Sequence, residues 1–387
     1  WLFIGIYTIT WIIFIFFKDV LVNNFSISYT TAITTLILVI PCGIRQILYQ
    51  ILRVRNHITL YTFSIIFYQA MFITFFLTVP HFKSSVNANL ILMAMGCSIA
   101  IIDLLIMLRI SINYKIKMYI DKKIIQEVLT YLIPLFFTNV SYWFIMNISK
   151  FIFQNAKDYT STSVFGLTWS SIGCFLSPIL TVFIFSSFPI IVKKFELKQR
   201  VKTYFTSLLQ LYFLLLTPIV SIFFLYSKQI TSVLLPDSYS QAWILFPFFA
   251  TAMCLHELTK LINIKYHLQN KIYIELCLGI LAAIIAYVLN IHLIEELNLM
   301  GAAIALLLSE ILLLAMNMFV KFQNFDYINY GKIIKTMLIA ILTSICIYKI
   351  VAIPFIDANK YMHLVEIALY LSLNYGLCFK FRKNILN

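Results

Sequence analysis

The sequence is poor in charged residues, which make up only 11% of its 387 residues, and acidic residues number just 15. Glycine and proline are scarce as well, with 9 of each, so long stretches contain no residue that interrupts a helix. The 7 cysteines all lie in apolar runs and form no CxxC pair. These shortages exclude a water-exposed surface of ordinary polarity, a disulfide framework and a cysteine-ligated metal site.

Hydrophobic residues instead make up 62% of the chain, and the mean hydropathy is +0.93. Apolar runs of about 20 residues recur along the whole length, which is typical of helices that cross a membrane. We therefore predict an all-α polytopic membrane protein with about twelve transmembrane helices. The predicted spans lie near 1–17, 29–51, 59–79, 88–108, 127–149, 162–191, 204–226, 240–262, 272–291, 299–320, 332–352 and 362–379.

Most of the 29 Lys and Arg residues lie in every second loop between these runs. The positive-inside rule places those loops, and the C-terminus, in the cytoplasm. The opposite loops are short, the longest near 227–241, which argues against an extracellular domain or an outer catalytic site. The net charge of +14 is dispersed rather than gathered on one face, so no nucleic-acid partner is expected. The chain begins at Trp1 within an apolar run, without Met or a basic leader, and we expect it to be truncated at its N-terminus.

Two cations and a polar stripe lie at membrane depth, where charges are costly. Arg45 and Lys150 are candidates for binding an anionic headgroup, and the alternative for each is snorkelling to the nearby interface. Asn139, Asn147 and Ser149 form a loose polar stripe that favours a water-filled path beside 127–149.

The run CLHELTKLINIK places His256, Glu257 and Lys260 within one span. A structural ion pair between Glu257 and Lys260 is one interpretation, and an ion-coupling or headgroup site is the other. The spacing does not match HExxH, and no catalytic or metal constellation is found. Isolated acids, each a candidate for carrying a proton or for a neutral buried role, are Asp103, Glu275, Glu310 and Glu366. Of all the acids we select Asp103, Glu257 and Glu310 as candidates for ion coupling.

Aromatic residues make up 16% of the chain, and most are expected in the core and the interfacial belt. Tyr142 and Trp143, which lie beside the polar stripe, are candidates for stacking on sugar rings.

Four segments resemble a known family in their order and spacing. They are LIPLFFTNVSYWFIMNISKFIF, VFGLTWSSIGCFLSPILTVFIFSSFPIIVKKFE, LLPDSYSQAWILFPFFA and LMGAAIALLLSEILLL. The region 132–319 is similar to the second half of the oligosaccharide-lipid flippases. These are the O-antigen and capsular polysaccharide translocases of the multidrug/oligosaccharidyl-lipid/polysaccharide exporter superfamily. Earlier in the chain, RVRNHITLYTFSIIFYQA resembles the link between the family's fourth and fifth helices.

The resemblance implies two pseudo-symmetric helical bundles around a central cavity, with the family's first two helices missing here. It divides the chain into a partial N-terminal bundle with a basic connector (1–125), a six-helix bundle (126–320) and two additional helices (321–387). Family members often carry an acid before a basic residue where this chain has Ser149 and Lys150. An ion-coupling role at that position is therefore in doubt.

The implied function is alternating-access translocation of a polyprenyl-diphosphate-linked oligosaccharide across the bacterial cytoplasmic membrane, for surface polysaccharide synthesis. Expected partners are this lipid-linked glycan, membrane lipid and the polysaccharide polymerase machinery. No cofactor is expected beyond coupling to a proton or sodium gradient. The diphosphate would be bound by Arg45, Lys150 and Lys260, and the glycan by Asn139, Asn147, Tyr142 and Trp143.

Two alternatives stay open. One is an integral-membrane polysaccharide polymerase or acyltransferase, which the short outer loops disfavour. The other is a drug or metabolite exporter of the same superfamily.

Overall fold

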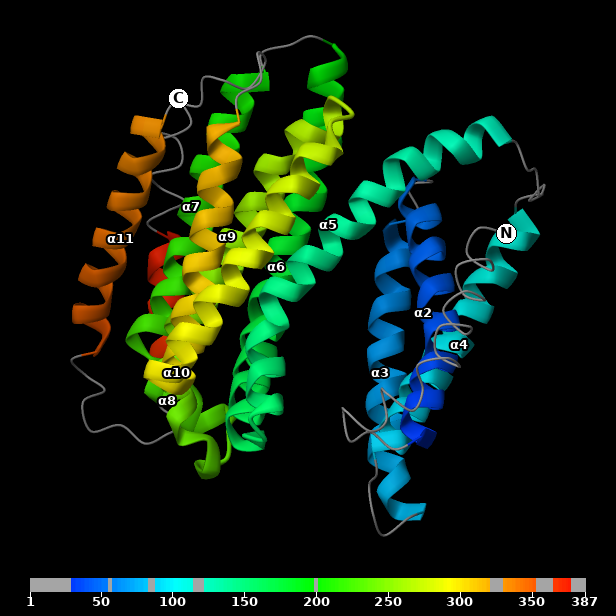
Figure 1. Cartoon of the computed structure of the whole chain (residues 1–387), viewed down its shortest axis with the longest axis horizontal. Coiled ribbons are helices and arrows are strands. Elements are labelled where there is room, and N and C mark those ends of the chain that lie inside the picture. The colour runs from blue at the N-terminus through cyan, green and yellow to red at the C-terminus, as the bar shows by residue number, and fades with distance from the viewer. Residues whose placement is uncertain are drawn as a thin grey trace. The chain divides into compact units, whose positions relative to one another are not determined.

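The computed structural model describes residues 29–54, 58–82, 88–113, 122–197, 201–320, 330–352 and 365–376, and within these ranges every regular element is a helix. In chain order they are α2 (Tyr29–Val54), α3 (Ile58–Phe82), α4 (Ala88–Asn113), α5 (Lys122–Asn155), α6 (Tyr159–Glu196), α7 (Val201–Leu225), α8 (Ser227–Leu234), the 3-10 helix η1 (Asp237–Ile244), α9 (Leu245–Leu268), α10 (Ile272–Phe319) and α11 (Tyr330–Ala352). Figure 1 labels the α-helices. Residues 365–376 are helical as well.

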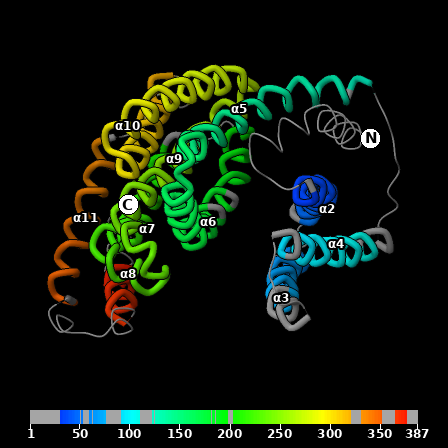
Figure 2. The backbone as a smooth tube through the Cα atoms, turned by 60° about the horizontal axis from the view of Figure 1, so that its bottom comes forward, coloured from blue at the N-terminus to red at the C-terminus, as the bar shows by residue number. Residues whose placement is uncertain are grey.

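The chain forms two compact units, Trp1–Ile120 and Asp121–Asn387. The first contains α2, α3 and α4, with a small core around Leu52, Ile102 and Ile106. The second contains α5 to α11 around a much larger core. Figure 2 shows α9 of this second unit among α6, α7 and α10, all of which it contacts, while α11 packs on α7. The finer three-part division at residues 125 and 320 stays a prediction.

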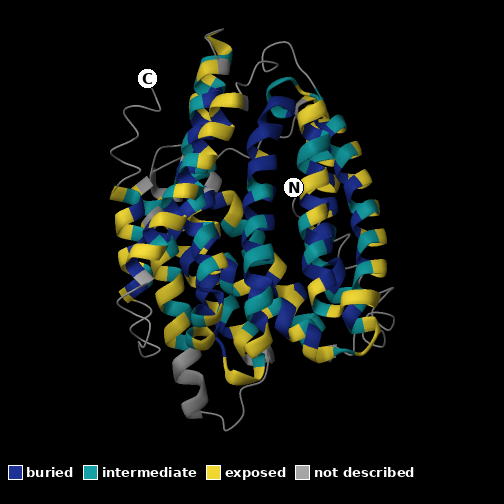
Figure 3. Cartoon of the chain, turned by 90° about the vertical axis from the view of Figure 1, so that its left-hand side faces the viewer, coloured by how far each residue is buried: buried dark blue, intermediate teal, exposed yellow. Residues whose placement is uncertain are grey.

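Figure 3 shows exposed positions along the outside of the helices, and many of these positions carry large apolar side chains. Phe136, Val182, Leu342 and Ile350 each expose more than 60% of their surface. In water such a surface would aggregate, whereas lipid tails solvate it without cost. Within the described residues, eight helices are long and apolar enough to cross a membrane, and the shorter apolar stretch Thr59–Phe75 lies in α3. The chain is thus a multi-pass helical membrane protein.

α10 contains two of the predicted spans, 272–291 and 299–320, in one element of 48 residues. A straight helix of that length would extend about 72 Å, more than twice the hydrocarbon core. The backbone instead leaves helical geometry at Asn298, where φ is 51° and ψ is −125°. A side chain at Gly301 would overlap the backbone carbonyl of Leu293, so the two halves meet closely at this turn. The count of twelve spans stays a prediction, because 1–17 lies outside the described residues.

A tight polar turn joins α5 to α6 between the predicted spans 127–149 and 162–191. Lys157 adopts a left-handed conformation there, with φ of 59°. Asp158 caps α6 by accepting a hydrogen bond from the backbone N–H of Ser161 at 2.9 Å. Hydrogen bonds from the side chain and backbone of Ser161 lower the pKa of this carboxyl group. The turn holds α5 and α6 antiparallel and in contact.

Candidate functional site

A buried polar cluster lies where α5, α9 and α10 meet in the second unit. Tyr142 of α5 donates a hydrogen bond to Glu275 Oε1 of α10 at 3.1 Å. Asn263 of α9 donates to the Tyr142 hydroxyl at 2.9 Å and to Glu275 Oε1 at 3.0 Å. All three side chains are at least 95% buried. A buried carboxyl group needs such donors. The hydrogen bonds to Glu275 Oε1 therefore link α5, α9 and α10.

The cluster extends toward one end of α5 through a histidine. His267 of α9 places Nε2 3.4 Å from Glu275 Oε2, an ion-pair distance rather than an optimal hydrogen bond. Its other ring nitrogen, Nδ1, lies 2.9 Å from the Tyr131 hydroxyl of α5. Tyr131 is 37% exposed, so the chain of groups runs from the surface to the buried carboxyl group.

A second histidine–acid pair lies on the other side of Tyr142. His256 Nδ1 of α9 is 3.1 Å from Glu310 Oε1, in the second half of α10, and both residues are buried. The His256 ring meets the Tyr142 ring edge to face at 5.4 Å between centroids. Tyr142 therefore contacts both histidine–acid pairs, one through its hydroxyl and one through its ring.

One further polar contact joins α5 to α10. Ser149 donates a hydrogen bond to Asn290 Oδ1 at 2.6 Å, and both side chains are buried. Between this contact and Glu275, α10 presents Gly279, Ala282 and Ala286, which are buried and small. Small residues let two membrane helices approach closely. Gly279 of α10 lies against Tyr142 and Ser141 of α5.

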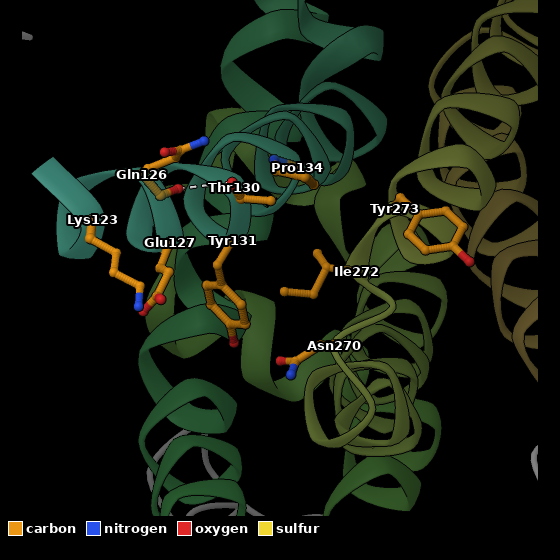
Figure 4. A pocket seen from close by; sticks show the side chains of 9 residues that line it. All are labelled: Lys123, Gln126, Glu127, Thr130, Tyr131, Pro134, Asn270, Ile272 and Tyr273. Atoms are coloured by element: carbon orange, nitrogen blue, oxygen red, sulfur yellow. Dashed lines mark hydrogen bonds between the residues drawn. The ribbon is translucent and has the colours of Figure 1, made fainter.

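A pocket of about 790 Å³ opens at the Lys122 end of α5. Figure 4 shows its lining: Lys123, Gln126, Glu127, Thr130, Tyr131 and Pro134 from α5, then Asn270, Ile272 and Tyr273 from the start of α10 and the turn before it. The first turns of α5 and of α10 meet at this pocket. Both helices follow loops that are predicted to lie on the cytoplasmic side. Because Tyr131 lines the pocket, its hydroxyl connects the pocket to the buried cluster.

A second pocket, of about 460 Å³, is apolar and lies among α7, α9 and α11. Its walls include Phe213, Leu216, Leu255 and Ile341, and the lining residues with a hydroxyl group are Tyr212, Thr217, Ser221 and Thr251. Such a lining suits a hydrocarbon chain rather than a charged or sugar group.

The three cations selected from the sequence lie apart. Arg45 is half-buried in the first unit, with its guanidinium 4.5 Å from the centre of the Tyr68 ring. In the second unit, Lys150 donates to Asn147 Oδ1 at 3.0 Å. Lys260 pairs with Glu257 at 2.7 Å and stays 42% exposed. The ion pair that was one interpretation of the Glu257 and Lys260 spacing is therefore present, while the binding roles of all three cations stay predictions.

The other selected residues occupy varied environments. Asn139 is exposed and bonds to a carbonyl of its own helix, as Asn147 does. Trp143 is 54% exposed, whereas neighbouring Tyr142 is buried and engaged by Glu275. Asp103 is buried in α4, and neither carboxyl oxygen has a hydrogen-bond partner among the described residues; the nearby charge that acts on it is that of Arg45.

Sequence reasoning noted Glu275 only as an isolated acid and did not select Asn263, His267 or Tyr131. A signal was present, since His256, Asn263 and His267 are spaced at i, i+7 and i+11 and so share one face of α9. Tyr131, Tyr142 and Ser149 share a face of α5 in the same way, at i, i+11 and i+18. No group of three His, Cys, Asp or Glu residues suited to a metal ion occurs in the described part of the chain.

Comparison with known proteins gives a likeness in structure and none in sequence. No protein-family model and no curated protein matches the sequence. Among solved structures, the chain matches "Lipid II flippase MurJ, inward closed conformation" with a TM-score of 0.69 and 16% sequence identity. The match covers 99% of this chain and 82% of that one. The chain therefore has the fold of that flippase.

Proposed function

We propose that the protein translocates polyprenyl-diphosphate-linked oligosaccharide units across the bacterial cytoplasmic membrane by alternating access, for surface polysaccharide synthesis. The observation that carries this proposal is the structural likeness, along nearly the whole chain, to a protein named as a lipid II flippase. The four sequence segments between 132 and 319 support the same class of transporter. Translocation makes and breaks no covalent bond, so the proposal needs no catalytic constellation.

The substrate has three parts, and the residues support a place for each. The diphosphate requires cations, for which Arg45, Lys150 and Lys260 are proposed. Lys260 suits this role because its exposed pair with Glu257 is worth only about 0.2–1 kcal/mol. An incoming diphosphate carries more charge than one carboxylate and can displace Glu257.

The glycan and the lipid chain make different demands. Exposed Trp143 offers a ring face for a sugar, and Asn139 and Asn147 offer amide groups nearby. Tyr142 has its hydroxyl engaged by Glu275, so we propose that it supports this surface from beneath. The apolar pocket among α7, α9 and α11 supports a place for part of the polyprenyl chain.

The test is translocation by the purified protein in liposomes. A polyprenyl-diphosphate oligosaccharide is placed on both leaflets, and a glycosidase added outside removes every sugar it can reach. Liposomes with the protein should lose their whole glycan pool, and protein-free liposomes only the outer half. A pool that stays half protected despite folded protein refutes the proposal. Export of a cationic drug in place of the glycan would assign the protein to the exporter alternative.

Variants then separate the site from the scaffold. Arg45→Ala and Lys260→Ala should slow translocation while membrane insertion and thermal stability stay unchanged. Lys193→Ala removes an exposed lysine at the end of α6 and serves as the matched control. Glu257→Gln, which frees Lys260, should preserve translocation. Full complementation of a flippase-deficient strain by both Arg45→Ala and Lys260→Ala would remove these two residues from the site.

A further inference from the structure

The two carboxyl oxygens of Glu275 have unequal surroundings. Oε1 accepts hydrogen bonds from Tyr142 and Asn263, whereas Oε2 is buried and accepts none among the described residues. The nearest basic group to Oε2 is His267 Nε2 at 3.4 Å. Glu275 is only 3% exposed, and a buried carboxylate with an unused oxygen is an acceptor for a proton.

The titratable groups around Glu275 come from each helix packed against it. α5 contributes Tyr131 and Tyr142, and α9 contributes Tyr266 and His267. The second half of α10 adds Glu310, whose charge acts on Tyr142 and is itself paired with His256. His267 is thus the basic group in contact with Glu275, and it also contacts Tyr131, which lines the pocket.

We propose that Glu275 is a proton-binding site of the second unit, loaded from the pocket at the Lys122 end of α5 through Tyr131 and His267. We assign the Nε2–H tautomer to His267 in the resting arrangement, so that Tyr131 O–H donates to Nδ1 at 2.9 Å and Nε2–H faces the Glu275 carboxylate at 3.4 Å. Figure 4 shows Tyr131 among the side chains that line the pocket, and 37% of the Tyr131 surface is exposed.

Loading moves protons along this chain without any redox change. Tyr131 gives its proton to His267 Nδ1 and takes one from a hydronium ion in the pocket, which becomes water. His267 gives its Nε2 proton to Glu275 Oε2. The net result is one proton added to Glu275 and a change of the His267 tautomer from Nε2–H to Nδ1–H. Histidine suits this step because its two nitrogens can accept and donate on opposite sides of the ring.

Proton binding at Glu275 changes how three helices are fastened. The charged carboxylate accepts from Tyr142 of α5 and Asn263 of α9, and bonds to a charged acceptor are about twice as strong as neutral ones. Neutralising Glu275 therefore loosens α5 and α9 from the first half of α10. Given the proposed function, this gives a transporter a proton-dependent step, with its access route on the side predicted to be cytoplasmic.

The test is infrared difference spectroscopy of the purified, lipid-reconstituted protein between neutral and acid pH, without substrate. A buried carboxylic acid should give a C=O band that shifts in heavy water. Glu275→Gln should abolish this band, whereas Glu310→Gln and the exposed-acid control Glu295→Gln should retain it. A band that persists in Glu275→Gln, or the absence of any such band in the wild type, overturns the proposal.

The route is tested by the rate at which the band exchanges with heavy water. This measurement does not use Glu275→Gln, so it remains possible if that variant unfolds. Tyr131→Phe and His267→Gln should keep the band but slow its exchange with heavy water about a hundredfold, as loss of a proton-transfer group does. Exchange at the wild-type rate in both variants overturns the route. These readouts need no glycan, so a failure of glycan translocation would refute the proposed function and leave the proton site standing. If the wild type shows the band but Glu275→Gln translocates glycan at the wild-type rate, only the coupling of proton binding to translocation is refuted.

Discussion

Replacing Tyr142 by Phe removes one hydroxyl group that serves two helices at once. That hydroxyl donates to Glu275 and accepts from Asn263. Replacing Asn263 by Leu removes the amide that donates to both Tyr142 and Glu275 and leaves a side chain of similar size. Each single change therefore deletes two hydrogen bonds, and the bond between Tyr142 and Asn263 is counted in both.

The magnitude follows from the number of bonds and from what each is worth in a membrane. Bonds to charged groups contribute about 1.5–3 kcal/mol in water-soluble proteins. Bonds between membrane helices average about 0.6 kcal/mol, because a chain unfolded in lipid also finds partners. We adopt the second value, so each single change should cost about 1.2 kcal/mol of unfolding free energy. The double variant loses three bonds rather than four and should cost about 1.8 kcal/mol, giving a coupling of about 0.6 kcal/mol.

The measurement is unfolding in mixed micelles titrated with a denaturing detergent, for the wild type, both single variants and the double variant. Tyr287→Phe is the matched control, because Tyr287 lies on α10 with 47% of its surface exposed. It should change the unfolding free energy by less than about 0.5 kcal/mol. Single effects that add to within about 0.3 kcal/mol would show that Tyr142 and Asn263 do not share a bond.

Three other changes test the scaffold. Gly301→Ala should cost about 3 kcal/mol in the same assay, since the added methyl group overlaps backbone in the α10 turn, while Gly173→Ala, which meets only the end of a methionine, should be nearly neutral. Asp158→Ala should cost about 1 kcal/mol by removing the N-cap of α6. The pKa of Asp158 is lowered in the folded protein. This stabilisation is therefore present above the pKa of Asp158 in the unfolded chain and is lost as the pH falls through the pKa in the folded protein. The unfolding free energies of the variant and the wild type should become equal in strong acid. Alkaline phosphatase fused after Lys228 should be active and after Lys198 inactive, and the reverse pattern would overturn the predicted orientation.

The helices themselves could be predicted because each apolar run contains its own signal. Hydropathy alone places α2, α4, α7 and α11 to within a few residues of the predicted spans. Loop charge predicts the orientation of these helices, which stays a prediction. The turn within α10 was also predictable as a gap between two spans, although the structure forms it with one non-helical residue, Asn298.

The polar cluster could not be predicted, because its bonds join helices that are far apart in sequence. The predicted stripe of Asn139, Asn147 and Ser149 was drawn along one helix without knowing which face is buried. Residues ten apart on a helix point roughly 80° away from each other, and Asn139 is exposed while Ser149 is buried. The face that packs against α9 and α10 carries Tyr142 and Ser149, which are buried, and Tyr131, which lies at the surface end of the same face. Aromatic residues were assigned to the core and the interfacial belt, which hid their role as hydrogen-bonding groups.

Two polar contacts join α5 to α10, and only one of them includes a group that can change its charge. Ser149 and Asn290 are neutral, at the position where the resembling flippases often have an acid, so their bond is the same at any pH. Two turns away, about 10 Å along α5, Tyr142 meets the ionisable Glu275. Any proton-dependent change must therefore begin at the Glu275 end. If Glu275 binds a proton as proposed, we expect α5 to stay in place near its Asn155 end and to move at its Lys122 end, where the pocket opens.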